Sequence, residues 1–478
     1  MKQRSITNRI SSNESDMVVA VDREQTQGAS TRNDELLFGP DQSTDTTVEE
    51  QLLLLSPAGG QTPIKESVLF FLSAVGCTIG WTAVLSNLVY YTDTLGVDSF
   101  LFLNLAVYAP LLPVTLAQAI WDAQFDRRFR SLRSFWFRGT VSFSVALICL
   151  MLLPWTSKSL VLLSVTSVFL GLSSAVLQGM MIQMASFVYP SCGRLSAAVT
   201  AGMQASAVLV LAVSVTSGFG GCASSEELRS FYFTIAFLLF VCWACFQILL
   251  NYSQGVVRSM KRRDSLFLSS PEMVEPLLSS EEPLLSSTHE QDEDNQVQAD
   301  APPQDIVELS FSDIWIKTWP VCFVIMLTVG SSMSVASWFN RVESQDATNA
   351  AFPQVLFYTR LLADLMGRLS TLYGAPKSIV SLVALAVLRL GFVPIFFLYT
   401  LTNLIPKNDV AAALGVFGFA FTSGYLATLS YQFAPTLLSD HERERNTTKQ
   451  ASLINVCFSA SVLLGLAASF VLNIAIDS

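Results

Sequence analysis

Charged residues are scarce in this chain of 478 residues, since Asp, Glu, Lys and Arg together make up only 14% of the sequence. A typical soluble domain contains roughly 25%. Hydrophobic residues reach 51%, and the mean hydropathy is +0.48. This composition excludes an ordinary water-soluble globular protein and indicates a chain that lies in a membrane.

Histidine is almost absent, and the two that occur, His289 and His441, belong to no cluster with metal-ligand spacing. The sequence also lacks a Gly-x-x-x-x-Gly-Lys phosphate loop and a Gly-x-Ser-x-Gly nucleophile motif. We therefore expect no enzymatic activity, no metal, no cofactor and no coupling to nucleotide hydrolysis. Most of the eight cysteines fall in or beside apolar segments, so no disulfide framework is predicted.

The chain does contain many long apolar runs, each of about 18–28 residues, which is the length a helix needs to cross a bilayer. We count eleven and predict an all-α, polytopic membrane protein. The runs lie at 66–91, 99–121, 139–156, 159–188, 194–216, 229–252, 314–339, 351–372, 378–400, 410–433 and 448–475. No cleavable signal peptide is expected, because the first run follows a polar segment and is itself long enough to span.

Two polar segments divide the chain. Residues 1–63 are predicted to form a disordered cytoplasmic tail, and residues 257–312 a disordered acidic cytoplasmic linker. Residues 64–256 then hold helices 1–6, and residues 313–478 hold helices 7–11. The sequence thus predicts a 6 + 5 bundle like that of the major facilitators.

Lys and Arg in the short loops predict the orientation. One side of the membrane receives most of them, including Arg127, Arg128, Arg130, Arg133, Arg258 and Lys261, whereas the other side receives only Arg229, Arg341 and Lys407. The N-terminus is therefore predicted to be cytoplasmic and the C-terminus extracellular or lumenal. The plasma membrane is favoured over an endolysosomal or vacuolar membrane.

An acidic dileucine pattern precedes the first span, in the segment Glu49-Glu-Gln-Leu-Leu-Leu. It fits recognition by sorting adaptors through Leu53 and Leu54. The alternative is a low-complexity segment in which the leucines occur by chance.

Three ionisable residues, Arg360, Asp364 and Arg368, lie four residues apart in the run 351–372 and so share one helical face. An ionised side chain near the bilayer centre costs on the order of 2.5–3.5 kcal/mol on insertion scales, so such groups pair and face a bundle interior or a wet path. We predict that these three form a charge network or gate inside the bundle.

Polar residues and helix breakers recur through the spans in a definite order. They occur in GCTIGWT (Gly76–Thr82), SAVLQG (Ser174–Gly179), DLMGR (Asp364–Arg368), RLGFVPIF (Arg389–Phe396) and SGYLATLSYQFAP (Ser423–Pro435). In this order they resemble the equilibrative nucleoside transporter family. The resemblance implies transport of nucleosides or nucleobases. The chain departs from the family where Gly80-Trp81-Thr82 replaces Pro-Trp-Asn, which exchanges an amide for a hydroxyl with fewer hydrogen-bonding sites.

The substrate site is predicted from residues that suit an uncharged ligand with hydroxyls, amides and an aromatic face. Trp81 can stack on a base and Gln178 can pair with its edge, while Asp364 accepts from ribose hydroxyls. Thr82, Arg368 and Arg389 complete the predicted translocation site. For Trp81 and Gln178 the alternative is helix packing, and for Asp364 and Arg368 it is a gate or interhelix ion pair.

The function predicted from these features is alternating-access transport of nucleosides or nucleobases, by facilitated diffusion. Proton coupling, if present, would fall to Asp364. One alternative is a facilitator-superfamily carrier of a sugar, an organic acid or a drug, because Asp122, Asp126, Arg127 and Arg128 and the DLMGR segment also resemble that superfamily. Another is a membrane interaction protein that transports nothing.

Overall fold

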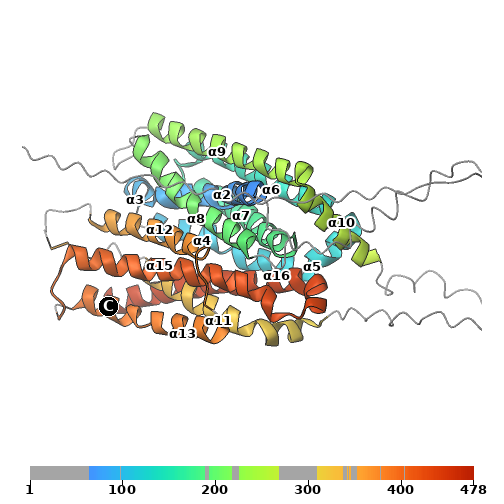
Figure 1. The fold of residues 1–478 in the computed structure, drawn as a ribbon. Helices are drawn as coiled ribbons and strands as arrows, with labels where there is room; N and C mark the ends of the chain where they lie inside the picture. The colour runs from blue at the N-terminus through green and yellow to red at the C-terminus, as the bar shows by residue number, and fades with distance from the viewer. Residues whose placement is uncertain are drawn as a thin grey trace, which may run out of the picture. The chain divides into compact units, whose positions relative to one another are not determined.

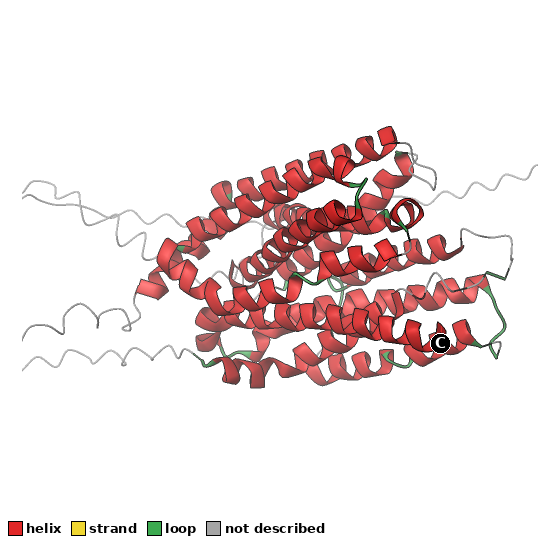
Figure 2. Cartoon of the chain, turned by 180° about the vertical axis from the view of Figure 1, so that it is seen from behind, coloured by secondary structure: helices red, strands yellow, loops and turns green. Residues whose placement is uncertain are grey.

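The computed structural model describes residues 64–268 and 309–477, with gaps at 97, 189–192 and 218–224, within 337–351, and at 377 and 403. In this part of the chain every regular element is a helix, as Figures 1 and 2 show. The predicted tail 1–63, with Leu53 and Leu54, and residues 269–308 of the predicted linker lie outside the described residues. The sorting signal therefore stays a prediction.

The N-terminal set of helices runs from α2 to α10. Their bounds are α2 (Ile64–Ser86), α3 (Leu88–Leu95), α4 (Asp98–Tyr108), α5 (Leu111–Phe129), α6 (Ser131–Thr156), α7 (Leu160–Val188), α8 (Arg194–Thr216), α9 (Ser225–Tyr252) and α10 (Gln254–Leu268). The predicted run 66–91 is interrupted at Asn87, and the run 99–121 at Ala109 and Pro110. Because α10 continues to Leu268, the first residues of the predicted linker are helical.

The C-terminal set runs from α11 to α16. Its bounds are α11 (Phe311–Ala336), α12 (Phe352–Ser370), α13 (Ile379–Arg389), α14 (Phe392–Leu401), α15 (Asp409–Phe433), the 3₁₀ helix η3 (Ala434–Leu437) and α16 (Asp440–Asp477). The predicted run 378–400 bends at Leu390 and Gly391, between α13 and α14. The last helix begins eight residues before its predicted apolar run.

Ten helical segments among the described residues are long and apolar enough to cross a membrane. One of these segments is formed by α4 and α5 together, and another by α13 and α14 together. The chain is therefore a multi-pass membrane protein, as predicted. The predicted run that is not among these ten is 351–372, which forms α12, has 19 residues and carries Arg360, Asp364 and Arg368. Because these charges set α12 apart from the ten apolar helices, the count of eleven stays a prediction.

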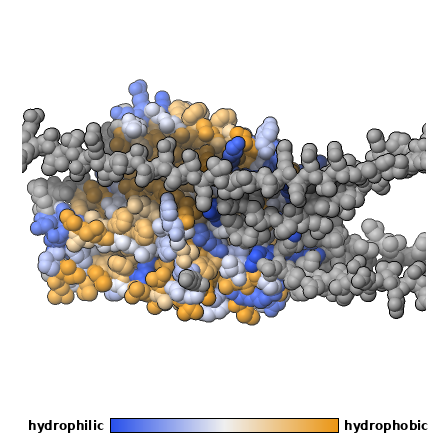
Figure 3. Space-filling model, viewed as in Figure 1, coloured by the Kyte–Doolittle hydropathy of each residue, from blue (hydrophilic) through white to orange (hydrophobic). Residues whose placement is uncertain are grey.

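Large apolar side chains cover much of the outer surface. Trp121, Phe237 and Leu388 are exposed by 60%, 65% and 75% of their area, and Figure 3 shows apolar residues over much of the described part of one face. Exposure on this scale is a liability in water but matches the hydrocarbon of a bilayer. The outer surface thus agrees with the composition of the chain.

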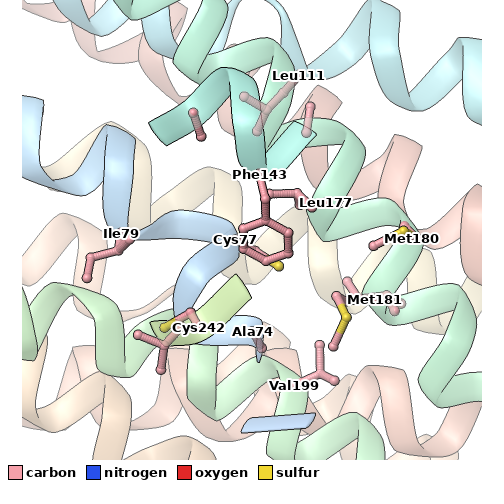
Figure 4. Close-up of a cluster of buried hydrophobic side chains, with 14 of the residues drawn as sticks. Ala74, Cys77, Ile79, Leu111, Phe143, Leu177, Met180, Met181, Val199 and Cys242 are labelled. Atoms are coloured by element: carbon pink, nitrogen blue, oxygen red, sulfur yellow. The ribbon is translucent and has the colours of Figure 1, made fainter. Parts of the chain in front are cut away.

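The core of the N-terminal set forms where α2, α6 and α9 approach closely. A Cβ atom added at Gly76 of α2 would lie 2.6 Å from the Cβ of Cys242 and 2.7 Å from the ring of Phe143. In Figure 4 the ring of Phe143 lies beside Cys77 in the centre of this cluster. Small residues on α2 thus allow the dense packing that holds membrane helices together.

The helices share one end that serves as a landmark, which we call the α10 end. The hydroxyl of Ser259 in α10 donates to the carbonyl of Val188, the last residue of α7, at 3.0 Å. Helix α8 begins shortly after this point, at Arg194, so its first turns also lie at the α10 end.

Helices α12 and α15 pack backbone against backbone through two glycines. A Cβ at Gly367 would lie 2.0 Å from the carbonyl oxygen of Phe421, and a Cβ at Gly424 would lie 2.1 Å from that of Asp364. No side chain fits at either position without moving a helix. These glycines therefore hold the charged helix α12 against α15.

We expect Gly424→Ala to destabilise the protein by about 1–3 kcal/mol, because the added methyl overpacks the α12–α15 contact. Gly415→Ala on the same helix is the matched control, since nothing lies within 4 Å of a Cβ placed there. Thermal melting of the purified protein in detergent measures both. Equal melting temperatures for the two variants would contradict the packing role.

Candidate functional site

The charged face of α12 carries an ion pair within the helix. Arg368 Nε donates to Asp364 Oδ2 at 3.0 Å, and the two side chains are 15% and 12% exposed. The predicted pairing of these two residues is therefore present in the structure. Because both are largely buried, the pair lies in the bundle interior and not against lipid.

Arg368 also connects the two sets of helices. Its Nη1 donates to the backbone carbonyl of Thr200 in α8 at 3.2 Å. The hydroxyl of Thr200 lies 3.1 Å from that of Thr428 in α15. We call these three residues the central junction, because they join α8 of the N-terminal set to α12 and α15 of the C-terminal set.

An aromatic pair lies next to the charged face. The rings of Trp81 in α2 and Tyr108 in α4 meet edge to face, with centroids 5.3 Å apart. Arg360 interacts electrostatically with both Tyr108 and Asp364. The structure thus brings Trp81, from the N-terminal set, into one group with Arg360 and Asp364, from the C-terminal set.

Two further predicted site residues lie on α2 and α7. The hydroxyl of Thr82 donates to the carbonyl of Thr78 at 2.7 Å and lies 3.5 Å from that of Ser206, in the α2–α8 contact. Gln178 is half-buried on α7, and its side chain takes part in none of the hydrogen bonds found among the described residues. Its neighbour Gly179 instead leaves room for Gln118 of α5, whose Nε2 donates to the carbonyl of Val176 at 3.2 Å.

Arg389 is buried to 2% exposure and is held by α11 and α15. Its guanidinium donates to the carbonyls of Thr328 and Phe419 and to the hydroxyls of Ser331 and Ser332, at 2.5 to 3.3 Å. It also lies 3.9 Å from the centroid of the Phe419 ring. Asp364 acts on it only through the electrostatic field. Arg389 thus ties three helices of the C-terminal set together, and its role in translocation stays a prediction.

A second group of buried charges lies at the α10 end, consisting of Asp122, Asp126, Arg138 and Arg263. Arg138 pairs with Asp122 at 2.6 Å and with Asp126 at 2.9 Å, and Arg263 of α10 pairs with Asp126 at 2.8 Å. Burial lowers the pKa of the Arg263 guanidinium, and the charge of Asp126 opposes this shift. These four residues, which we call the α10-end cluster, bind α10 to α5 and α6.

The α10-end cluster reaches the C-terminal set through one amide. Nε2 of Gln183 in α7 donates to Asp122 Oδ2 at 2.8 Å and to the hydroxyl of Ser452 in α16 at 2.9 Å. Gln183 is fully buried. This contact and the central junction both join the two sets of helices, and the Gln183 contact does so at the α10 end.

Sequence reasoning missed several of these residues. Gln183 lies five positions after Gln178 in the same apolar run, and Thr200 and Thr428 are two of several hydroxyl residues in long apolar helices. An amide side chain inside an apolar span is a signal in the sequence that could have identified Gln118 and Gln183. Nothing in the local sequence separates Thr200 from the many other hydroxyl residues of these spans.

Comparison with known proteins agrees with this arrangement. A family model described as nucleoside transporter matches residues 164–475. Among solved structures, the major-facilitator proton:xylose symporter XylE with bound 6-bromo-6-deoxy-D-glucose is similar at 10% identity, over 86% of this chain and 88% of that one, with a TM-score of 0.53. The Escherichia coli fucose:proton symporter FucP gives 12% identity, 86% and 92% coverage and a TM-score of 0.45. A comparison with curated proteins finds no match.

The likeness to XylE confirms the predicted major-facilitator fold, which the helical architecture of the described residues also supports. At this identity it says nothing about the solute.

We expect Asp126→Asn to destabilise the protein by about 3–5 kcal/mol, because it removes the charge that pairs with two buried guanidinium groups. The matched control is Glu442→Gln, which breaks a pair with Lys317, a side chain that is 39% exposed. Such a surface pair contributes about 1 kcal/mol or less. Thermal melting in detergent compares the two, and an equal loss would contradict the structural role of the cluster.

Proposed function

Since this chain belongs to the nucleoside transporter family and is a membrane transporter, we propose that it carries uncharged nucleosides or nucleobases by facilitated diffusion and alternating access. The observation that carries the proposal is the group formed by Trp81, Tyr108, Arg360, Asp364 and Arg368, which spans both sets of helices. When two bundles rock about such a group, a solute bound between them is exposed to one side of the membrane at a time.

The chemistry of this group suits a nucleoside. A carboxylate and guanidinium groups can hydrogen-bond ribose hydroxyls and base edges, and an aromatic face can stack on a base. Arg360, Arg368 and Arg389 outnumber the single acid Asp364, which disfavours organic cations. The same positive excess makes an organic anion the second candidate substrate.

The proposed orientation has the N-terminus in the cytoplasm and the C-terminus outside the cell or in a lumen, with the plasma membrane as the location. It is supported by the exposed residues Arg128, Arg130 and Arg133, which lie between Asp126 and Arg138 of the α10-end cluster in sequence, and by Arg258 and Lys261 on the outer face of α10. Positive charge at one end of a bundle marks the cytoplasmic side. The α10 end is then cytoplasmic.

Uptake of labelled adenosine and uridine into a cell that lacks nucleoside transport tests the function. We expect saturable accumulation that unlabelled nucleosides or bases compete away. Accumulation of an organic anion, a sugar or a drug alone would favour another carrier of this fold. Accumulation of none of these solutes would contradict the proposal.

In the same assay, Asp364→Asn and Arg368→Ala should each lower the maximal uptake rate by about tenfold or more, since breaking a buried pair leaves one partner unsatisfied. Surface labelling must show normal amounts of protein, and Gly415→Ala serves as the silent control. Wild-type rates in both variants would remove the pair from the translocation site.

Collapse of the proton gradient with a protonophore should leave the initial uptake rate unchanged, because facilitated diffusion draws only on the solute gradient. The measurement compares initial rates of labelled nucleoside uptake at matched external pH. A large fall in rate would instead favour proton symport, with Asp364 as the titrating carboxylate in the membrane.

A further inference from the structure

A small cavity lies between the two sets of helices, one helical turn from the central junction toward the α10 end. It is lined by Ile182 and Ser186 of α7, Ser196 of α8, Tyr431 of α15, Pro435 of η3 and Gln450 of α16, among others. Its volume is about 10 Å³, room for about one water molecule. Small-molecule sites usually measure about 300–1,000 Å³, so the helices around this cavity must separate before it can hold a ligand of that size.

Gln450 carries an unsatisfied acceptor beside this cavity. The residue is 1% exposed, and its Nε2 donates to the carbonyl of Ala434 at 2.7 Å and to the hydroxyl of Thr318 at 3.1 Å. The carbonyl can only accept, so it fixes which amide atom is the nitrogen. Oε1 then has no hydrogen-bond partner among the described residues. A buried acceptor without a partner costs free energy that a ligand with a donor recovers.

The other polar groups of the cavity also present acceptors. The hydroxyl of Tyr431 donates to Asn455 Oδ1 at 3.2 Å, and that of Ser186 donates to the carbonyl of Gln183 at 2.7 Å. Their protons are committed, so their oxygens are free to accept. Ile182 and Pro435 supply apolar walls. The cavity therefore suits a ligand that has hydrogen-bond donors and an apolar face.

Positive charge near the cavity disfavours a cation at this place, and Nε of Arg443 donates to the carbonyl of Pro435 at 3.0 Å. Arg368 of the central junction interacts electrostatically with Tyr431. Once the helices separate, the lining therefore suits an uncharged molecule rich in donors, such as a nucleoside with its ribose hydroxyls and exocyclic amine.

We propose that this cavity is a second nucleoside contact on the transport path, used at the α10 end after the solute has passed the central junction. Gln450 Oε1 accepts a hydrogen bond from the nucleoside there. The cavity widens when α16 moves away from α7 and α8, which breaks the Gln183–Ser452 contact. This inference rests on the proposed function and adds a binding step on one side of the membrane only.

The test compares the two directions of transport in the full-length protein. Gln450→Met keeps the size of the side chain and removes the acceptor. We expect the KM for efflux of labelled uridine from preloaded cells to rise about three- to tenfold, the effect of one lost hydrogen bond. The KM for influx should stay within about twofold, since the outward-facing site does not use Gln450.

Two further variants separate binding from packing. Thr318→Val removes a partner of Gln450 Nε2 but leaves Oε1 in place, so we expect wild-type KM values in both directions. Tyr431→Phe removes one hydroxyl from the cavity and should also raise the efflux KM, which keeps the test decisive if Gln450→Met does not fold.

Equal changes in both directions, or no change in either, would overturn the second contact while leaving the transport function intact. Failure of the wild-type protein to move uridine or adenosine in either direction would instead overturn the proposed function and this inference with it.

Discussion

Buried guanidinium groups are the constraint on which the C-terminal helices depend. Away from bulk water, their N–H groups need acceptors inside the protein. Arg389 solves this with the hydroxyls of two serines and two backbone carbonyls from α11 and α15. Arg368 solves it with Asp364 and a carbonyl of α8. The positions of α11, α12, α13 and α15 relative to one another follow from these demands.

The contacts within each set of helices differ in kind from those between the sets. Within a set, glycines such as Gly367 and Gly424 bring backbones together so closely that the helices must move as one. Between the sets, hydrogen bonds such as Gln183–Ser452 and Thr200–Thr428 add to the packing of apolar side chains from both sets. Bonds of this type contribute about 0.6 kcal/mol each in membrane proteins. Bonds that are individually weak can break and re-form as the two sets rock, which alternating access requires.

The sequence predicted the fold well because crossing a bilayer leaves a strong local signal, a run of apolar residues long enough to span it. It did not predict the interruptions at Asn87 and Leu390, since apolar composition does not distinguish a straight helix from a broken one. The Asp364–Arg368 pair was predictable because four-residue spacing fixes which side chains meet on a helix. The partners of Arg389 and the role of Gln183 were not, because they depend on how separate helices pack.

Thr82 shows that helix packing limits what a sequence motif can predict about a site residue. The hydroxyl that replaces an amide at this position is already bonded to Thr78 and lies near Ser206 in the α2–α8 contact. Its proton is therefore committed within α2, while its oxygen can still accept a hydrogen bond. On the proposed function, α2 then offers a solute the ring of Trp81 and an acceptor at Thr82, and the charged part of recognition falls on α12. A site divided in this way, with an aromatic face on one set of helices and hydrogen-bonding charges on the other, holds a solute tightly only while the two sets are close together.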